Sequence, residues 1–165
     1  MLIQISQRPA TEAADLFDAF VACHQRIRDF LTLARRIAQQ LDASAPEVID
    51  AAQRVERYFS LAFPLHVADE ELSLAPRLRH KTTELDRALR AMHEQHGGHR
   101  APLELMLSTM KEVRSDPANV LLRRRLGVLV SELESELEAH LQLEESVLFP
   151  AARRWLSSEE QREIL

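Results

Sequence analysis

The sequence predicts an all-α protein, an antiparallel up-and-down four-helix bundle followed by a short C-terminal helix. Glycine, which weakens helices, occurs only three times in 165 residues, while Leu, Ala, Glu and Arg are plentiful. Along four long segments, apolar residues recur at spacings of three and four, as on a helix with one buried face. We expect one domain over residues 1–165, with the bundle at about residues 12–155.

The first two segments form a predicted hairpin, and a histidine interrupts the apolar pattern of each. The stretch Ala43-Ser44-Ala45-Pro46 separates them, and proline is favoured at the first position of a helix. Inside the helical patterns, Pro64 and Pro102 each remove a backbone hydrogen bond and predict a kink. The expected inward positions are Leu16, Phe20, His24, Ile27, Leu31, Ala34 and Ala38 in the first helix, and Val48, Ala51, Val55, Phe59, Ala62, His66, Glu70 and Leu74 in the second.

The third and fourth segments form a second predicted hairpin with the same character. Thr83 with Asp86 resembles an acidic capping box at the start of the third helix. The pair Asp116-Pro117 predicts the N-cap and first position of the fourth, and Ser157 or Ser158 the cap of the final short helix. The expected inward positions are Leu85, Leu89, Met92, His96, Leu103, Leu107 and Met110 in the third helix, and Leu126, Leu129, Leu133, Leu137, His140, Glu144 and Val147 in the fourth.

Composition argues against several classes of protein. The formal net charge is −5, and no basic stripe with interleaved aromatic residues is present, so we expect no nucleic-acid binding. No apolar run reaches the length of a membrane-spanning helix. The single cysteine, Cys23, excludes an intramolecular disulfide and suits a reducing compartment, so we expect a cytoplasmic protein.

One motif occurs twice in the chain. Both copies read H-x-x-x-E-E-x-x-L-x-P, and every matched position is separated by 74 residues. The matched pairs are His66 and His140, Glu70 and Glu144, Glu71 and Glu145, Leu74 and Leu148, and Pro76 and Pro150. His24 and His96 follow nearly the same repeat, 72 residues apart. The chain therefore reads as two helical hairpins, each with one lone histidine and one H-x-x-x-E pair.

The lengths of the hairpin arms predict that these side chains meet. In antiparallel helices the distances from each histidine to the connecting turns nearly match, so the four histidines lie within about 5 Å of the same height. The spacing of four places Glu70 and Glu144 one turn from His66 and His140 on the same faces. A single buried histidine or glutamate is usually structural. Two carboxylates and four imidazoles in one layer, with no inward Lys or Arg at that height, instead call for metal cations.

Six protein ligands are too many for one tetrahedral zinc ion, which takes four. They suit two octahedral ions with bridging carboxylates and open positions. Mixed imidazole and carboxylate ligands suit iron, with manganese or zinc as alternatives. The chain has no set of thiolates for an iron–sulfur cluster.

The segments Cys23-His24-Gln25-Arg26-Ile27 and Met92-His93-Glu94-Gln95-His96, with the two repeated motifs, resemble the hemerythrin-like or HHE cation-binding family over about residues 12–155. The resemblance implies a four-helix bundle that holds two non-haem irons bridged by oxygen and two carboxylates. The residues that it implies as ligands are His24, His66, His96 and His140, with Glu70 and Glu144 as bridges.

The resemblance leaves a fifth histidine open. Members that carry O2 usually have one, a turn from the third-helix ligand. Here His93 and His99 each lie three residues from His96, and His93 is the first choice. With only four histidines the site resembles the iron–sulfur-repair and stress-response branch, which usually carries a cysteine-bearing N-terminal domain that is absent here.

The sequence also predicts the environment of residues next to these ligands and a favoured function. We expect Glu71 and Glu145 to be solvated rather than bonded to a ligand imidazole, and Cys23 to be a buried structural thiol. The favoured function is the binding of O2 or a related small diatomic or peroxide ligand for sensing or carriage, with a separate redox or signalling partner. The alternatives are a redox enzyme acting on nitric oxide or peroxide, an iron donor for cluster repair, iron storage, and a helical interaction module that binds no metal.

Overall fold

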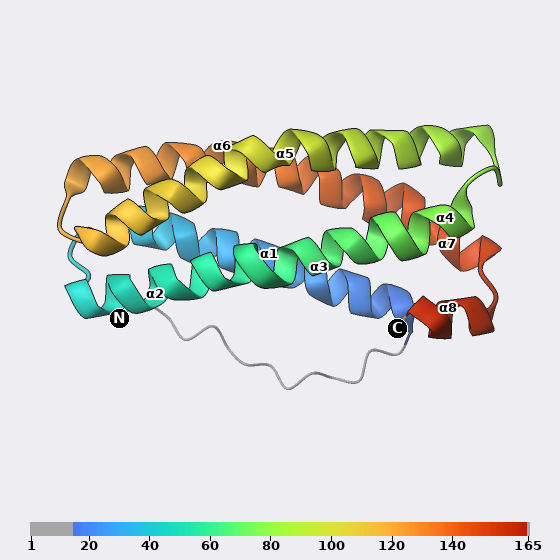
Figure 1. Ribbon diagram of the computed structural model, residues 1–165, viewed down its shortest axis with the longest axis horizontal. Helices are drawn as coiled ribbons and strands as arrows, with labels where there is room; N and C mark the ends of the chain where they lie inside the picture. The colour runs from blue at the N-terminus through green and yellow to red at the C-terminus, as the bar shows by residue number, and fades with distance from the viewer. Residues whose placement is uncertain (1–14, 165) are drawn as a thin grey trace.

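The computed structural model describes residues 15–164, and within that range the chain forms helices and turns but no strand. Four helical stretches lie side by side (Figure 1), which confirms the all-α prediction; residues 12–14 of the expected bundle lie outside the described residues. The first stretch is α1 (Leu16–Gln39) and the third is α5 (Thr83–Ser115). The second comprises α2 (Ala45–Arg57), η1 (Tyr58–Ala62), α3 (Phe63–Ala68), η2 (Asp69–Leu74) and α4 (Ala75–Leu78). The fourth comprises α6 (Val120–Leu143), η3 (Glu144–Leu148) and α7 (Phe149–Trp155), and α8 (Ser158–Ile164) follows it.

Consecutive stretches are joined by turns at alternate ends of the molecule (Figure 1). Helix α1 packs against α2 and α6, and α5 packs against the same two helices. The apolar core has two parts. One is built around Ile27, Val55, Met106 and Leu133, and the other around the ends of the stretches near Phe17, Leu78, Leu89 and Phe149. In each stretch one histidine of the predicted metal site lies between the two parts of the core: His24, His66, His96 or His140. A polar layer therefore crosses the bundle between two apolar clusters.

The helix starts follow the expected chemistry, with two shifts. Ser44 caps α2 in a capping box with Glu47, in which the Ser44 amide donates to the glutamate carboxylate. Helix α5 begins one residue earlier than expected, because the hydroxyl of Thr82, not Thr83, accepts the Leu85 amide. Asp116 is not the cap of α6.

Asn119 replaces Asp116 as the α6 cap because residues 116–119 close a turn of their own. The Asn119 amide donates to the Asp116 carbonyl, and its side-chain oxygen accepts from the amides of Leu121 and Leu122. The fourth helix therefore begins at Val120, three residues after the expected Pro117.

Three wide π-helical turns interrupt the second and fourth stretches, and a proline follows each by two residues. The pairs are η1 with Pro64, η2 with Pro76 and η3 with Pro150. Proline lacks an amide hydrogen, and its ring clashes with the carbonyl four residues back, so a wider turn before it relieves the conflict. The proline of the repeated motif thus explains why both copies carry a π turn beside their glutamates. Pro102, by contrast, lies within the unbroken α5.

The π turns also shift the buried face by one residue. Ala62 and Val147, which the pattern of a regular α-helix placed inward, are exposed. The following residues, Phe63 and Leu148, are buried in their place. In α5, which has no π turn, Met106 is fully buried, whereas the expected inward residues Leu103 and Leu107 are only partly buried.

A buried arginine side chain joins α6 to α1 at the end of the bundle farthest from α8. The Arg123 side chain, on α6, is 2% exposed and donates to the carbonyls of Ile37 and Gln40 at the end of α1, each at 2.8 Å. A third, longer contact reaches the carbonyl of Pro117. Carbonyls in the last turn of a helix have no partner within the helix, and Arg123 supplies one for Ile37. The Gln40 carbonyl accepts the Ala43 amide as well as Arg123.

Candidate metal centre

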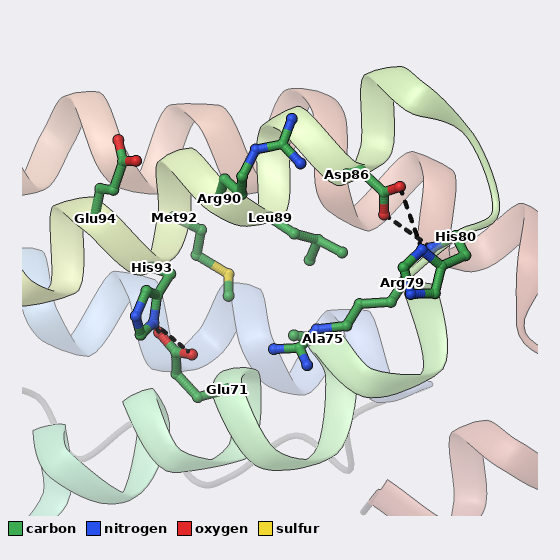
Figure 2. A pocket seen from close by; sticks show the side chains of 10 residues that line it. All are labelled: Glu71, Ala75, Arg79, His80, Asp86, Leu89, Arg90, Met92, His93 and Glu94. Carbon is green, nitrogen blue, oxygen red and sulfur yellow. Dashed lines mark hydrogen bonds and ion pairs between the residues drawn. The ribbon is translucent and has the colours of Figure 1, made fainter.

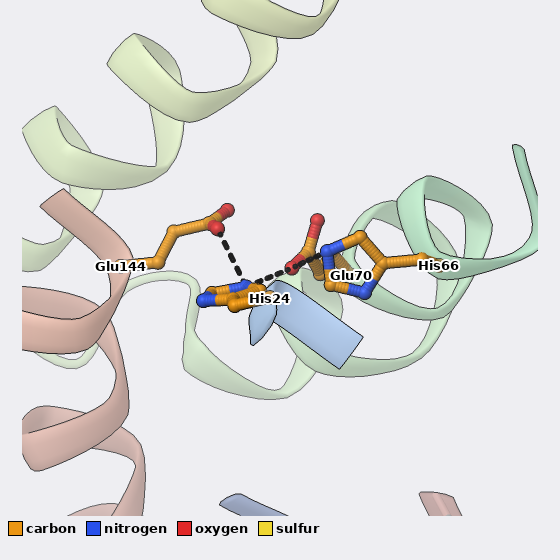
Figure 3. Close-up of side chains that lie close together, drawn as sticks. All are labelled: His24, His66, Glu70 and Glu144. Atoms are coloured by element: carbon orange, nitrogen blue, oxygen red, sulfur yellow. Dashed lines mark ion pairs between the residues drawn. The ribbon is translucent and has the colours of Figure 1, made fainter. Parts of the chain in front are cut away.

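Six side chains from four helical stretches converge between the two apolar clusters. They form two groups of four in which the nearest ligand atoms all lie within 4.8 Å of one another. Each group contains two histidines of its own, and both contain the same two glutamates, Glu70 and Glu144. The groups are His24, His66, Glu70 and Glu144, drawn in Figure 3, and His96, His140, Glu70 and Glu144.

In the first group the imidazoles of α1 and α3 face the two carboxylates (Figure 3). His24 Nε2 lies 3.3 Å from Glu144 Oε2 and 3.6 Å from Glu70 Oε1. His66 Nε2 lies 3.1 Å from the same Glu70 oxygen, one helical turn along. These nitrogens and oxygens surround one point, as ligands of a single cation would.

In the second group α5 and α6 supply the imidazoles. His96 Nε2 lies 3.3 Å from Glu70 Oε2, and His140 Nε2 lies 3.3 Å from Glu144 Oε1. The two Nε2 atoms face each other at 3.1 Å. Each glutamate therefore turns one oxygen toward each group, which is the arrangement that a carboxylate bridging two cations adopts.

The fit to cations rests on buried polar atoms that lack hydrogen bonds. Glu70 is fully buried and Glu144 is 1% exposed, yet none of their four carboxylate oxygens has a hydrogen-bond partner. The Nε2 atoms of His24 and His66 are in the same condition. Within residues 15–164, every ion pair of the two glutamates is with a histidine and none is with Lys or Arg. Such a set is costly to bury unless positive ions complete it.

Burial and mutual charge spread the pKa values of these groups apart. Although burial opposes it, the nearby carboxylates of Glu144 and Glu70 raise the pKa of His24 to about 9. Burial and the charge of His96 lower the pKa of His140 to about 3. Burial and the neighbouring Glu70 charge raise the pKa of Glu144, whereas contacts with histidines outweigh burial and lower that of Glu70. Without metal, a proton on His24 supplies part of the positive charge that the carboxylates need.

Side chains outside the two groups contact the outer ring nitrogens of His24 and His96. Glu145 Oε1 lies 2.8 Å from His24 Nδ1, and Glu71 Oε1 lies 2.8 Å from His96 Nδ1. The expectation that these two glutamates are solvated is wrong, because a neighbouring helix brings a histidine next to each carboxylate. The position of a residue around its own helix does not show which side chains a neighbouring helix places beside it.

Two further contacts around the histidines could not be predicted from the sequence. Gln95 Oε1 lies 3.0 Å from His140 Nδ1, and Arg28 donates to Glu145 at 2.9 Å. Neither has a sequence signal beyond lying near a histidine. His66 differs from the other three, because its Nδ1 is buried without a hydrogen-bond partner.

The structure does not bring His93 to the cluster. Its side chain is 74% exposed, and its Nδ1 lies 2.9 Å from Glu71. Figure 2 shows the two side chains meeting at the edge of a surface pocket of about 430 Å³ between α4 and α5. His99 also lies outside both groups, but it is buried, with its ring centroid 5.3 Å from that of His140 and its Nδ1 unpartnered.

Cys23 is partly buried and belongs to neither group. Burial raises the pKa of its thiol, which disfavours the thiolate that metal binding and redox chemistry need.

A helical protein with a buried layer of histidines that share two carboxylates is a metal-binding protein by its chemistry. The family model described as Hemerythrin HHE cation binding domain matches residues 15–161. The chain belongs to this hemerythrin-like family. A search of curated proteins found no match. In the described part of the chain, no helix combines the length and apolar character that crossing a membrane requires.

Proposed function

We propose that this protein is a non-haem di-iron protein, built on an antiparallel up-and-down four-helix bundle, that binds O2 or a related small oxidant for sensing or carriage. The observation that supports it most is the sharing of Glu70 and Glu144 by two groups of ligands. Shared carboxylates hold two cations close together, and mixed nitrogen and oxygen ligands suit iron, with manganese or zinc as alternatives.

In this proposal each residue has a defined role. His24 and His66 would hold one ion and His96 and His140 the other, and the two glutamates, which belong to both groups, would be shared between the ions. A reduced pair of irons would supply electrons to a bound oxidant, and the apolar clusters on either side keep water away. The protein would act with a separate redox or signalling partner, and the free Cys23 suits a cytoplasmic location.

The test is metal content with an absorption spectrum. Protein purified without a chelating tag and loaded anaerobically with iron should bind two irons per chain and, after oxidation, show the bands of an oxygen-bridged ferric pair. Replacing Glu70 or Glu144 by Ala should leave at most one tightly bound iron and abolish those bands. Two irons retained in both variants would refute the bridging role.

The place of His93 favours a second candidate function. With His93 at the surface, each ion would have two imidazoles and the shared carboxylates as protein ligands, which would leave more positions for reacting molecules. A site of this kind suits redox turnover of nitric oxide or peroxide, or donation of iron to damaged iron–sulfur clusters. His99 is the remaining candidate for a fifth histidine, because it is buried beside His140.

Exposure of the reduced protein to O2 separates the candidates. A reversible spectral change favours carriage or sensing. Rapid irreversible oxidation, together with turnover of peroxide or nitric oxide, favours the enzyme. Replacing His99 by Ala tests whether this ring contributes, and a ligand role predicts an altered spectrum of the loaded protein. The control is His80→Asn, which removes an exposed histidine that belongs to neither group and should leave the spectrum unchanged.

A further inference from the structure

The second glutamate of each repeated motif reaches across the molecule to the other hairpin. Glu71, in the first hairpin, contacts His96 of the second, and Glu145, in the second, contacts His24 of the first. Both distances are 2.8 Å between a carboxylate Oε1 and a ring Nδ1. The two contacts are therefore equivalent under the repeat, and each crosses between hairpins.

Both histidines are held at opposite ends of the ring. Nε2 of His24 and of His96 faces the shared carboxylates, and Nδ1 faces the outer glutamate. When Nε2 binds a metal, the remaining ring proton lies on Nδ1 and donates to that glutamate. Such a bond fixes both the tautomer and the orientation of a metal-binding imidazole.

We propose that Glu71 and Glu145 are positioning residues, each orienting a histidine of the opposite hairpin, so that one glutamate serves each metal position. This inference rests on the proposed two-metal function. His24 belongs to one group and His96 to the other, so the loss of one outer glutamate weakens one position and leaves the second intact.

The two glutamates are anchored differently. Arg28 donates to Glu145 at 2.9 Å and to Glu138 at 2.8 Å, so an ion-pair network across α1, α6 and η3 holds the Glu145 carboxylate. Glu71 is anchored by His93, whose side chain is 74% exposed. Arg28 therefore acts on the His24 position alone.

The experiment is a titration of the metal-free full-length protein with Co²⁺, followed by its visible absorption and by calorimetry. Wild-type protein should bind two ions. Glu71→Ala and Glu145→Ala should each weaken one ion by about 10- to 100-fold and leave the other unchanged, and the double variant should weaken both. The control is Glu94→Ala, which removes an exposed glutamate of α5 that lines the same surface pocket as Glu71. It should change the affinity for neither ion.

Conservative variants separate positioning from a purely structural role. Glu71→Gln and Glu145→Gln keep an oxygen that accepts the Nδ1 proton and should recover most of the lost affinity. A fall in the unfolding midpoint with both Co²⁺ affinities unchanged would overturn the proposal, as would equal weakening of both ions by either single variant. If wild-type protein fails to bind two ions, the proposed function itself falls, and this inference falls with it.

Arginine variants on α1 provide a matched pair. Arg28 and Arg35 both form ion pairs with glutamates of α6. Arg35, however, pairs with Glu134, which forms no ion pair with a histidine within residues 15–164. Arg28→Ala should weaken the same ion as Glu145→Ala, to a smaller extent, whereas Arg35→Ala should weaken neither. Equal effects of the two arginine variants would overturn the role assigned to Arg28.

Discussion

Glu70 and Glu144 are buried so deeply that their charges dominate the centre of the bundle. In the metal-free protein the positive charge comes from histidines, and the four rings do not share it equally. The pKa of His24 rises to about 9, while burial and neighbouring rings bring that of His140 to about 3. His24 therefore holds a proton at neutral pH that a metal ion must displace, and His140 is already neutral.

Proton release should accompany metal binding. A raised pKa means that protonated His24 stabilises the folded metal-free chain below pH 6.5, and that this contribution is lost as pH rises through about 9. Metal affinity should move oppositely, rising with pH over the same window, with release of about one proton from His24 at pH 7. Calorimetry in buffers of different ionisation enthalpy measures it; binding that releases no proton would contradict the assignment.

At the scale of the helices, the positions of the ligands could be predicted from the sequence because they depend only on spacing. The 74-residue repeat and the near-equal hairpin arms place His24, His66, His96 and His140 in one layer. The exposed Ala62 and Val147 could not be predicted from a regular helical period, because π turns insert an extra residue ahead of the prolines. The prolines were the signal, since each follows a π turn by two residues.

Contacts between helices, such as that of Glu71 with His96, limit what the sequence predicts in a different way. The angle of Glu71 around its own helix says nothing about what the facing helix offers, so its bond to His96 required the packed structure. The same holds for His93 and His99. Both lie three residues from His96, and only the rotation of α5 against its neighbours decides that His99 is buried and His93 exposed.

Arg123 provides a prediction at the level of one helix junction. Arg123→Ala removes the donor to the Ile37 carbonyl and one of the two donors to the Gln40 carbonyl, and should lower the free energy of unfolding by about 2 to 4 kcal/mol. Urea unfolding measures the loss, with Arg124→Ala, an exposed neighbour, as control. Metal content of the folded variant should stay at the wild-type value, because the junction lies apart from the centre; loss of metal without loss of stability would contradict this separation.

For the whole molecule, the metal centre joins the two hairpins. Each group of ligands takes both histidines from one hairpin and a glutamate from each. Glu70 and Glu144, which both groups contain, and the outer contacts of Glu71 and Glu145 all cross the same interface. Metal binding is therefore coupled to the packing of the two halves of the chain.

Metal should accordingly stabilise the fold as a unit. At a free metal concentration of about 100 times the dissociation constant, each site adds about 2.7 kcal/mol to the free energy of unfolding. Thermal unfolding with Co²⁺ and with a chelator should show a clear rise of the midpoint on loading. The Glu70→Ala, Glu144→Ala double variant serves as the control, and an equal rise in that variant would mean that metal acts elsewhere.

The turn between α4 and α5 is the only covalent link between the two hairpins in the described part of the chain. Each hairpin carries three residues of its own group, and the fourth, a glutamate, comes from the other hairpin. Cutting the chain there would leave two complementary halves, each carrying three of the four ligands for its own ion. Metal binding would then hold two separate peptides together. The protein would become a heterodimer whose assembly depends on the cation and so reports its presence.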